Sequence, residues 1–454
     1  MKRKYPDGPR INVPLAIIGQ MFPKRFPFDP LAFAVGIAQQ FGDIVHYTLG
    51  SLHVFQLNNP DLIREILIEH PEKFHKPSLI KRAFRPVAGE GLFTSDGALW
   101  KQQRKLIQPA FHHRQLAAYA SVMVAQAETT MSSYRNGEVR DIGADMTRLT
   151  LGIVVKTLFG EDLPPEANQI GRSMVAVLDA TNERMNSVLR IPPWVPTPRN
   201  LREKRSLAEL DATIQSLIRT RRASPEGRDD LLSVLLAATD AESSAGMSDR
   251  QLRDEMTTLF LAGHETTATG LTWTWYLLSR HPEVAERLTG ELDRVLAGRA
   301  PLANDLPNLP YTEMVVREAM RLYPPAPGFA REPIEAVTIG GYDVPKGSLI
   351  VVNTYVLHRD ARFFADPERF DPERFAPGFE ERMQRYAYLP FGGGPRICIG
   401  NNIAMMEARL ILATMAQYYR FSLDPDEPVR PVQLVTLRPN RPVRMRVERR
   451  QRST

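Results

Sequence analysis

The stretch FGGGPRICIG, residues 391–400, places the only cysteine of this chain in a loop rich in glycine. A lone thiol cannot form an internal disulfide, and most free cysteines are small buried residues with no chemical task. Such a residue normally stands in an apolar run, whereas Cys398 lies between Arg396 and Gly400. Glycines at 392, 393, 394 and 400 admit backbone angles that other residues avoid. We therefore expect this loop to hold one sulfur in a defined place.

The residues that follow predict a helix over 401–419, because apolar side chains recur there at helical spacing. Cys398 then lies just before a helix N-terminus, where the positive end of the helix dipole favours an anion. The pKa of a thiol falls in such a setting, so we expect Cys398 to be a thiolate.

A thiolate can act as a nucleophile, a redox group or a metal ligand. No local motif pairs one of the nine histidines with Cys398, and the chain has no second cysteine to resolve a redox thiol. Zinc would need three more protein ligands. Haem needs one thiolate from the protein, since the porphyrin supplies four donors. Haem therefore fits the single thiol better than zinc does.

A second group of reactive residues lies inside a long predicted helix over 248–280. Ser248 and Gln251 have the spacing of a capping box, and Pro282 ends the pattern. The helix is apolar on nearly all faces from 259 to 278, so it should cross the interior. The polar segment AGHETT, residues 262–267, is out of place there. It is not the His-Glu-x-x-His zinc motif, because the fifth position is Ala268.

Five residues of the cysteine loop stand at the spacing Phe-x-x-Gly-x-Arg-x-Cys-x-Gly, which resembles the haem-binding loop of the cytochrome P450 family. They are Phe391, Gly394, Arg396, Cys398 and Gly400. The resemblance implies haem b as cofactor, with Cys398 as the axial iron ligand. It also implies that Phe391 packs beside the sulfur and that Arg396 bonds a haem propionate. A thiolate ligand donates electron density to iron and favours O–O cleavage.

The segment AGHETT is similar to the oxygen-activation motif of the same family. The resemblance implies that Thr266 positions a proton-donating water and that Glu265 links this water to solvent. Both would be catalytic residues. His264 is expected to be a packing residue and not a haem ligand. The hydroxyl of Thr266 can also bond a backbone carbonyl of its own helix.

Glu318 and Arg321 stand three residues apart and face each other on a predicted helix. In the family such a pair is buried and joined by an arginine from a later loop. We expect Arg374 to be this third residue in preference to Arg369, and the network to support the loop before Cys398.

Three further residues resemble positions that bind haem propionates in the family: Trp100, Arg104 and Arg331. Trp100 and Arg104 stand four apart on a predicted helix. Together with Arg396, these arginines would neutralise two carboxylates with charge-assisted hydrogen bonds.

The resemblance implies a haem-thiolate monooxygenase that uses O2 to hydroxylate or epoxidise a hydrophobic substrate such as a fatty acid, terpenoid or steroid. Family comparison places six residues around the substrate: Phe93, Leu261, Ala262, Ala326, Phe329 and Val435. Two alternatives stay open. One is a peroxide-using enzyme or isomerase of the same haem-thiolate type, and the other is a non-catalytic haem sensor.

The chain contains no dinucleotide-binding fingerprint and no flavin or ferredoxin module, so electrons must come from outside. We expect an acidic ferredoxin or flavodoxin with its reductase to bind near Lys101 and Lys105. The formal charge of +6 owes much to the basic C-terminus, and nucleic-acid binding is not expected. We expect a monomer.

The fold class expected is mainly α with a smaller β region, near 42–57, 336–353 and the C-terminus. Haem would lie between the long distal helix and the helix after the cysteine loop. We expect an N-terminal segment 1–40, one catalytic domain 41–445 and a basic tail 446–454. The charged N-terminus lacks a full signal-peptide pattern, and no apolar run reaches the ~20 residues of a membrane span. We therefore expect a cytoplasmic protein without an integral membrane anchor.

Overall fold

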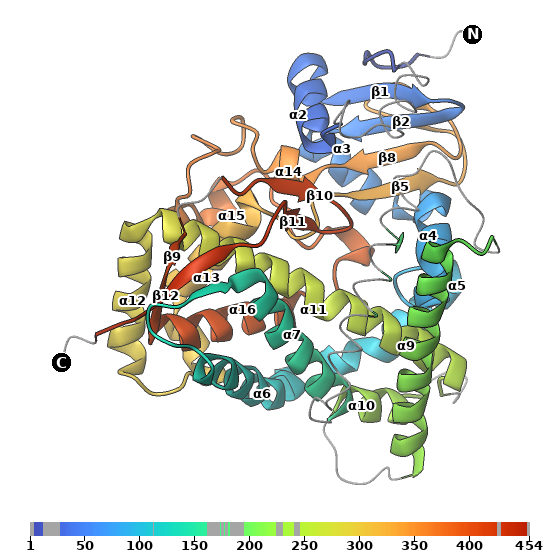
Figure 1. Ribbon diagram of the computed structural model, residues 1–454. Coiled ribbons are helices and arrows are strands. Elements are labelled where there is room, and N and C mark those ends of the chain that lie inside the picture. Colours follow the sequence, from blue (N-terminus) through green and yellow to red (C-terminus); the bar gives the residue numbers. More distant parts are fainter. Residues whose placement is uncertain are drawn as a thin grey trace.

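A computed structural model describes most of the chain, and Figure 1 shows a large helical body with a smaller sheet on one side. The described residues are 4–11, 28–111, 113–160, 173, 177, 180–181, 195–223, 230–239, 246–424 and 428–451. Parts of the proposed N-terminal segment and the last three residues of the proposed tail lie outside them.

Helices make up most of the described structure, which confirms the expected fold class. They are α2 (Pro30–Phe41), α3 (Pro60–Arg64), α4 (Ser78–Ala88), α5 (Gly97–Ile107), α6 (His113–Ser132), α7 (Ile142–Phe159), α9 (Pro198–Ala223), α10 (Leu231–Ala237), α11 (Asp249–Arg280), α12 (Pro282–Leu296), α13 (Pro310–Leu322), α14 (Thr354–Leu357), α15 (Phe379–Arg382) and α16 (Asn401–Ala416).

Helix α11 runs through the middle of the molecule (Figure 1). Its N-terminus has the predicted capping box, in which Ser248 and Gln251 satisfy each other's backbone N–H groups. At 1.5 Å per residue the helix is about 48 Å long. It packs against α7, α13 and α16, and most of its side chains are buried. The helix therefore crosses the interior, as its apolar composition predicts.

The larger sheet joins strands from distant parts of the chain, in the order β1-β2-β8-β5-β3. The strands are β1 (Ile44–Leu49), β2 (Leu52–Leu57), β3 (Phe74–His75), β5 (Phe329–Pro333) and β8 (Leu349–Val352). β2 and β8 are parallel, and the other pairs are antiparallel. The pairing of β3 with β5 brings Lys76, which directly follows β3, close enough to Arg331 of β5 for their charges to interact.

Smaller sheets complete the β region. β4 (Val139–Asp141), β12 (Arg444–Arg449) and β9 (Tyr419–Leu423) form a three-stranded sheet, while β6 (Val337–Ile339) pairs with β7 (Tyr342–Val344). β10 (Pro431–Gln433) and β11 (Leu437–Pro439) form a hairpin. Strand β12 spans the proposed domain boundary at 445/446.

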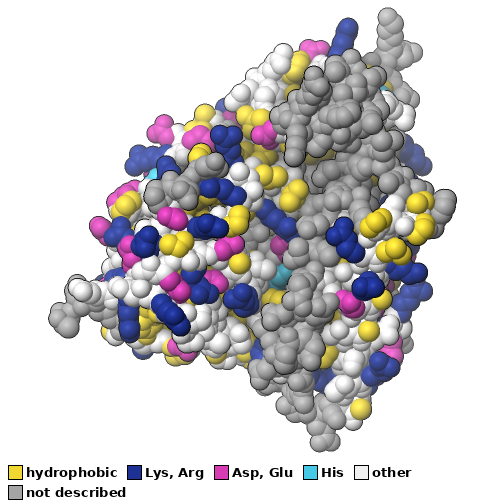
Figure 2. Space-filling model, in the orientation of Figure 1, with side chains coloured by type: hydrophobic (Ala, Val, Ile, Leu, Met, Phe, Trp, Pro, Cys, Tyr) yellow, Lys and Arg dark blue, Asp and Glu magenta, His cyan; other side chains and the backbone are white. Residues whose placement is uncertain are grey.

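The largest core cluster packs α6, α11, α13 and α16 against one another around Trp273 and Leu410. A second cluster lies between α7, α9, α10 and the first half of α11. On the face drawn in Figure 2, Lys and Arg side chains are interspersed with Asp and Glu. Among the described residues, no helix combines the length and apolar character needed to cross a membrane.

Candidate active site

The cysteine loop is a tight turn that leads into α16. The N–H of Cys398 donates to the carbonyl of Phe391 at 3.0 Å, which closes the loop. Gly392 and Gly394 have φ of 70° and 69°, where a side chain would be strained. A Cβ on Gly394 would also lie 2.3 Å from the carbonyl oxygen of Leu67. The shape of the loop therefore requires glycine at 394.

The other two glycines of the loop have ordinary backbone angles. Gly393 is extended, with φ of −159°, and Gly400 has φ of −89°. A Cβ on Gly400 would lie 3.5 Å from Ile403 and 3.9 Å from the sulfur of Cys398. These are ordinary contacts, so the backbone at 400 does not require glycine in the way that the backbone at 394 does.

The sulfur of Cys398 is exposed, yet protein surrounds it closely enough that burial raises the pKa of the thiol. The Gly400 N–H and the positive charges of Arg104 and Lys76 act in the opposite direction. The expected lowering of the thiol pKa by the helix terminus is therefore wrong for the chain by itself. A metal ion bound to the sulfur would supply the missing charge, because a coordinating thiol is deprotonated.

On the distal side, the hydroxyl of Thr266 donates to the carbonyl of Ala262 at 2.6 Å. The next threonine, Thr267, bonds the carbonyl of Gly263 at 3.2 Å. Gly263 faces α7, where a Cβ would lie 3.0 Å from Val154. His264 is buried, and its Nδ1 lies 3.3 Å from the carbonyl of Phe260. Thr266 is half-buried, whereas His264 is fully buried and is a packing residue.

Glu265 is held by the loop and strand at the tip of the β10–β11 hairpin. Its Oε1 accepts hydrogen bonds from Thr436 Oγ1 at 2.6 Å and from Arg438 Nε at 2.7 Å. No local sequence pattern marks these partners, because more than 170 residues separate them from Glu265. The acid is therefore engaged in an ion pair.

Four cationic side chains lie near the cysteine loop: Arg396, Arg331, Arg104 and Lys76. Arg396 pairs with Asp96, donates to the carbonyl of Ser95 at 3.1 Å, and lies over the Trp100 ring. Burial and the charge of Arg396 lower the pKa of Arg331 to about 10. Arg104 donates to the carbonyl of Ile397 at 2.8 Å, and this hydrogen bond stabilises the cysteine loop.

Lys76 is a further cation near the loop that no sequence motif predicts. Burial and the charges of Arg396 and Arg331 hold the pKa of Lys76 well below its usual range. No local motif marks this lysine, because it reaches the others only through the pairing of β3 with β5. Asp96 offsets only part of this positive charge.

The structure brings Glu318, Arg321 and Arg374 together. Both carboxylate oxygens of Glu318 accept from Arg321, at 2.7 and 2.8 Å, and both residues are 0% exposed. Arg374 Nε lies 3.4 Å from Glu318 Oε1. Arg369 contributes its backbone carbonyl to Arg321 and no side chain. Arg321 also donates to the carbonyl of His358, which precedes the segment leading to the cysteine loop.

The residues expected around the substrate lie in different environments. Ala262, Ala326 and Phe93 are exposed, and Phe329 and Val435 are half-buried. Leu261 is 9% exposed and belongs to the second core cluster. Among the six, Leu261 is the residue most like ordinary core.

A family model described as "Cytochrome P450" matches residues 6–446. The chain belongs to the cytochrome P450 family. Cyclooctatin synthase of Streptomyces melanosporofaciens is 38% identical over 404 residues, which cover 88% of each chain. Pentalenene oxygenase of Streptomyces avermitilis is 36% identical over 422 residues, which cover 92% of each chain. The structure titled "Crystal structure of cytochrome P450DA heme domain" matches with a TM-score of 0.86 and 28% identity, over 94% of this chain and 95% of that one.

This P450 is a haem-dependent monooxygenase that uses O2, a hydrophobic substrate and a redox partner. The chemistry of its site fits haem. A dianionic ligand would relieve the repulsion among Lys76, Arg331 and Arg396, which Asp96 alone does not balance. The exposed sulfur of Cys398 offers one soft ligand at the same place.

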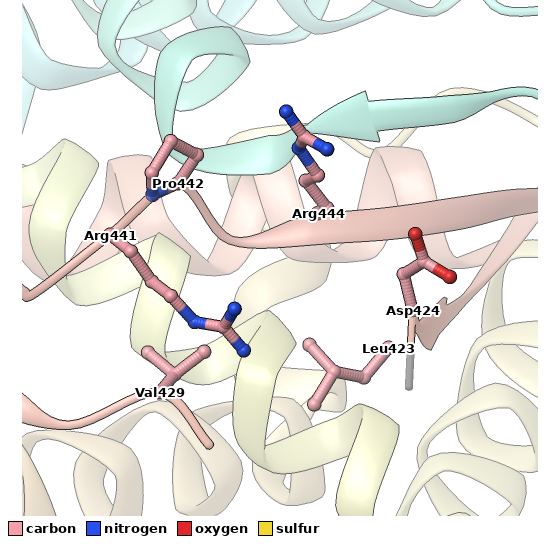
Figure 3. A pocket seen from close by; sticks show the side chains of 6 residues that line it. All are labelled: Leu423, Asp424, Val429, Arg441, Pro442 and Arg444. Carbon is pink, nitrogen blue, oxygen red and sulfur yellow. The ribbon is translucent and has the colours of Figure 1, made fainter. Parts of the chain in front are cut away.

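A separate hollow of the P450 lies among its C-terminal strands and is drawn in Figure 3. It is lined by Leu423, Asp424, Val429, Arg441, Pro442 and Arg444. None of the expected site residues lines it, so it is distinct from the proposed haem site.

Proposed function

We propose that this P450 oxidises a cyclic terpenoid. The observation that carries the proposal is the similarity, over nearly the full chain, to two relatives whose names specify such chemistry: pentalenene oxygenase and cyclooctat-9-en-7-ol 5-monooxygenase. The apolar character of Phe93, Ala262, Ala326 and Phe329 supports a hydrocarbon ligand over a polar one.

Within this proposal Cys398 would bind the haem iron, and Lys76, Arg331 and Arg396 would bind the haem propionates. Trp100 supports Arg396, and Arg104 holds the loop that carries the thiolate. The cofactor supplies the oxygen chemistry, while the chain supplies position and protons. Thr266 would hold a water beside α11, and Glu265 would exchange a proton with that water.

Electron transfer is proposed to occur across α5. Lys101 and Lys105 are exposed on this helix, four residues apart, and Arg104 between them contacts the cysteine loop. Positive charge there suits an acidic ferredoxin or flavodoxin with its reductase. We also propose a monomer in the cytoplasm, with one catalytic domain over 41–445 flanked by the segments 1–40 and 446–454.

The substrate class is tested by a spectral screen of the holoenzyme. Cyclic terpene hydrocarbons, cyclic terpene alcohols, fatty acids and steroids are each titrated while the haem spin-state change is recorded. Ligands that bind are then incubated with a surrogate ferredoxin and reductase, and products are identified by mass spectrometry. The proposal expects the strongest spin shift and an oxygenated product from a cyclic terpene. Binding and turnover confined to fatty acids or steroids would contradict it.

Electron-partner docking has its own test. Lys101 and Lys105 are reversed to glutamate, and a control variant reverses the exposed lysine Lys346, which precedes β8. We expect slower reduction by an acidic ferredoxin and a weaker salt dependence for the first variant only. Equal reduction rates in all three proteins would remove this docking site.

A further inference from the structure

The connection between α4 and α5, residues 89–96, joins two parts of the proposed site. At its far end, the carbonyl of Ser95 accepts from Arg396, and Asp96 pairs with the same arginine. Phe93, expected at the substrate, lies in the middle and is 37% exposed. The near end runs along the first third of α11. The position of Phe93 therefore depends on how this connection is held.

Two acidic side chains of α11 hold its backbone. Asp254 Oδ2 accepts the N–H of Glu90 at 2.9 Å, and Glu255 Oε2 accepts the N–H of Leu92 at 2.9 Å. Between them, a Cβ on Gly91 would lie 2.3 Å from the hydroxyl of Thr258 and 2.7 Å from the Asp254 carbonyl. The backbone thus lies directly against α11, and a larger residue at 91 would push it away.

Burying the carboxyl group of Glu255 at this position costs free energy. The residue is 0% exposed, and its Oε1 has no hydrogen-bond partner among the described residues. Burial raises its pKa to about 8, with Asp254 adding to the shift. The neutral acid still offers a carbonyl oxygen to Leu92. An apolar residue at 255 would avoid the burial cost but would leave the Leu92 N–H without an acceptor.

Phe93 is held from the other side as well. Its carbonyl accepts from Lys76 Nζ at 2.6 Å, and the same ammonium lies 3.8 Å from the centre of its ring. The Phe84 ring packs against the Phe93 ring, with 4.9 Å between the two ring centres. The Leu92 N–H bond and the buried Leu92 side chain therefore set where the next residue, Phe93, begins.

We propose that Glu255, with Asp254, positions the 89–96 connection so that Phe93 faces the substrate, which makes Glu255 a specificity-determining residue that does not itself touch substrate. This inference rests on the proposed function, because that function places Phe93 at the substrate. It assigns to two acids of α11 a role separate from the proton delivery proposed for Glu265 and Thr266.

The test uses the holoenzyme and two probes that bind haem iron, imidazole and 4-phenylimidazole. Imidazole is small, whereas the phenyl group of the larger probe extends toward the substrate side. The variants are Glu255→Met, which keeps the volume but removes the acceptor, and Glu255→Gln, which keeps a carbonyl. Asp254→Ala removes the second anchor independently. Glu291→Ala is the matched control, because Glu291 is a buried acid that accepts the Tyr311 and Thr312 N–H groups away from the site.

Spectral titration gives the Kd of each probe, and hydrogen exchange measures the protection of a peptide covering 89–96. For Glu255→Met and Asp254→Ala we expect the Kd of 4-phenylimidazole to rise about fivefold relative to that of imidazole, the effect of one lost hydrogen bond. Protection of the peptide should fall in the same variants. Glu255→Gln should keep the Kd ratio and the peptide protection close to those of the original protein. Glu291→Ala should lower thermal stability while leaving the Kd ratio unchanged.

An unchanged Kd ratio in both Glu255→Met and Asp254→Ala would overturn the proposal, as would a ratio that changes equally in Glu291→Ala. If Glu255→Met does not fold, Asp254→Ala alone decides the outcome by the same ratio. These results are independent of the substrate screen. Failure of the cyclic terpenes to bind would leave the azole ratio and the exchange data to test the positioning role.

Discussion

Arg438 reaches from the β10–β11 hairpin to Glu265 in the middle of α11, with its Nε 2.7 Å and its Nη2 2.5 Å from Oε1. The hairpin tip also carries Val435, expected at the substrate, and Thr436, which bonds the same carboxylate oxygen. Glu265, the proposed proton-delivery acid, is therefore bonded to the same hairpin that carries Val435.

Removing Arg438 should destabilise the protein and impair oxygen use. In Arg438→Gln the carboxylate of Glu265 keeps Thr436 but loses its counter-charge. Because the arginine is one-quarter exposed, we expect a loss of about 1–3 kcal/mol in unfolding free energy, below that of a fully buried pair. The fraction of consumed electrons recovered in product should also fall.

A double-mutant cycle with Glu265→Gln measures the coupling of the pair by chemical denaturation. We expect a coupling energy of about 0.5–3 kcal/mol. Strictly additive effects of the two substitutions would show that the ion pair contributes nothing.

Glycine 394 and glycine 400 provide a matched pair of substitutions. Gly394→Ala places a methyl group against the Leu67 carbonyl at a positive φ, so we expect a loss of about 1–3 kcal/mol and weaker haem retention. Gly400→Ala meets only ordinary contacts and should cost less. The measurement is thermal unfolding together with the haem-to-protein absorbance ratio. A larger effect at 400 than at 394 would contradict the loop geometry.

The Glu318–Arg321 pair should be far more important for stability than the contact with Arg374. Both members of the pair are 0% exposed, so Arg321→Ala leaves a buried charge and should cost about 3–5 kcal/mol. Arg374→Ala breaks one 3.4 Å ion pair and a hydrogen bond to the Asp366 carbonyl, and should cost less. Unfolding in urea, with haem loss followed in parallel, ranks the two variants. The reverse order would be inconsistent with the structure.

Glu407 should make stability depend on pH. It is 4% exposed on α16, and burial raises its pKa from 4.5 to about 8. Between these two pKa values the folded chain holds a proton that the unfolded chain releases. The contribution of Glu407 to the free energy of unfolding is therefore fully present below pH 4.5 and is lost as pH rises toward 8. Glu407→Gln should remove this loss. Its unfolding free energy relative to the original protein should increase between pH 5 and pH 8, and a constant difference would contradict the assignment.

Much of the site could be predicted because its residues lie in contiguous stretches. The cysteine loop, the capped helix with Thr266, and the Trp100 helix each carry their spacing within about thirty residues. Periodicity and capping chemistry determine such elements locally. The choice of Arg374 over Arg369 also agrees with the contacts, although local spacing alone did not settle it.

The remaining features arise from tertiary contacts. Lys76, Arg438 and Glu255 each act through a partner in a distant part of the sequence, and no local pattern marks them. The pKa of the Cys398 thiol differs from its prediction for the same reason. Burial by the folded chain outweighs the helix terminus and two nearby cations, and neither the degree of burial nor the cations can be read from the loop sequence.

The central claim is that the sulfur of Cys398 binds the haem iron. The direct measurement is the absorption spectrum of the reduced carbon monoxide complex, recorded for the original protein and for Cys398→His under mild conditions. We predict a haem-thiolate Soret band in the original protein and a globin-like band at shorter wavelength in the variant. A globin-like band in the original protein, or a haem-thiolate band that survives the substitution, would contradict the claim.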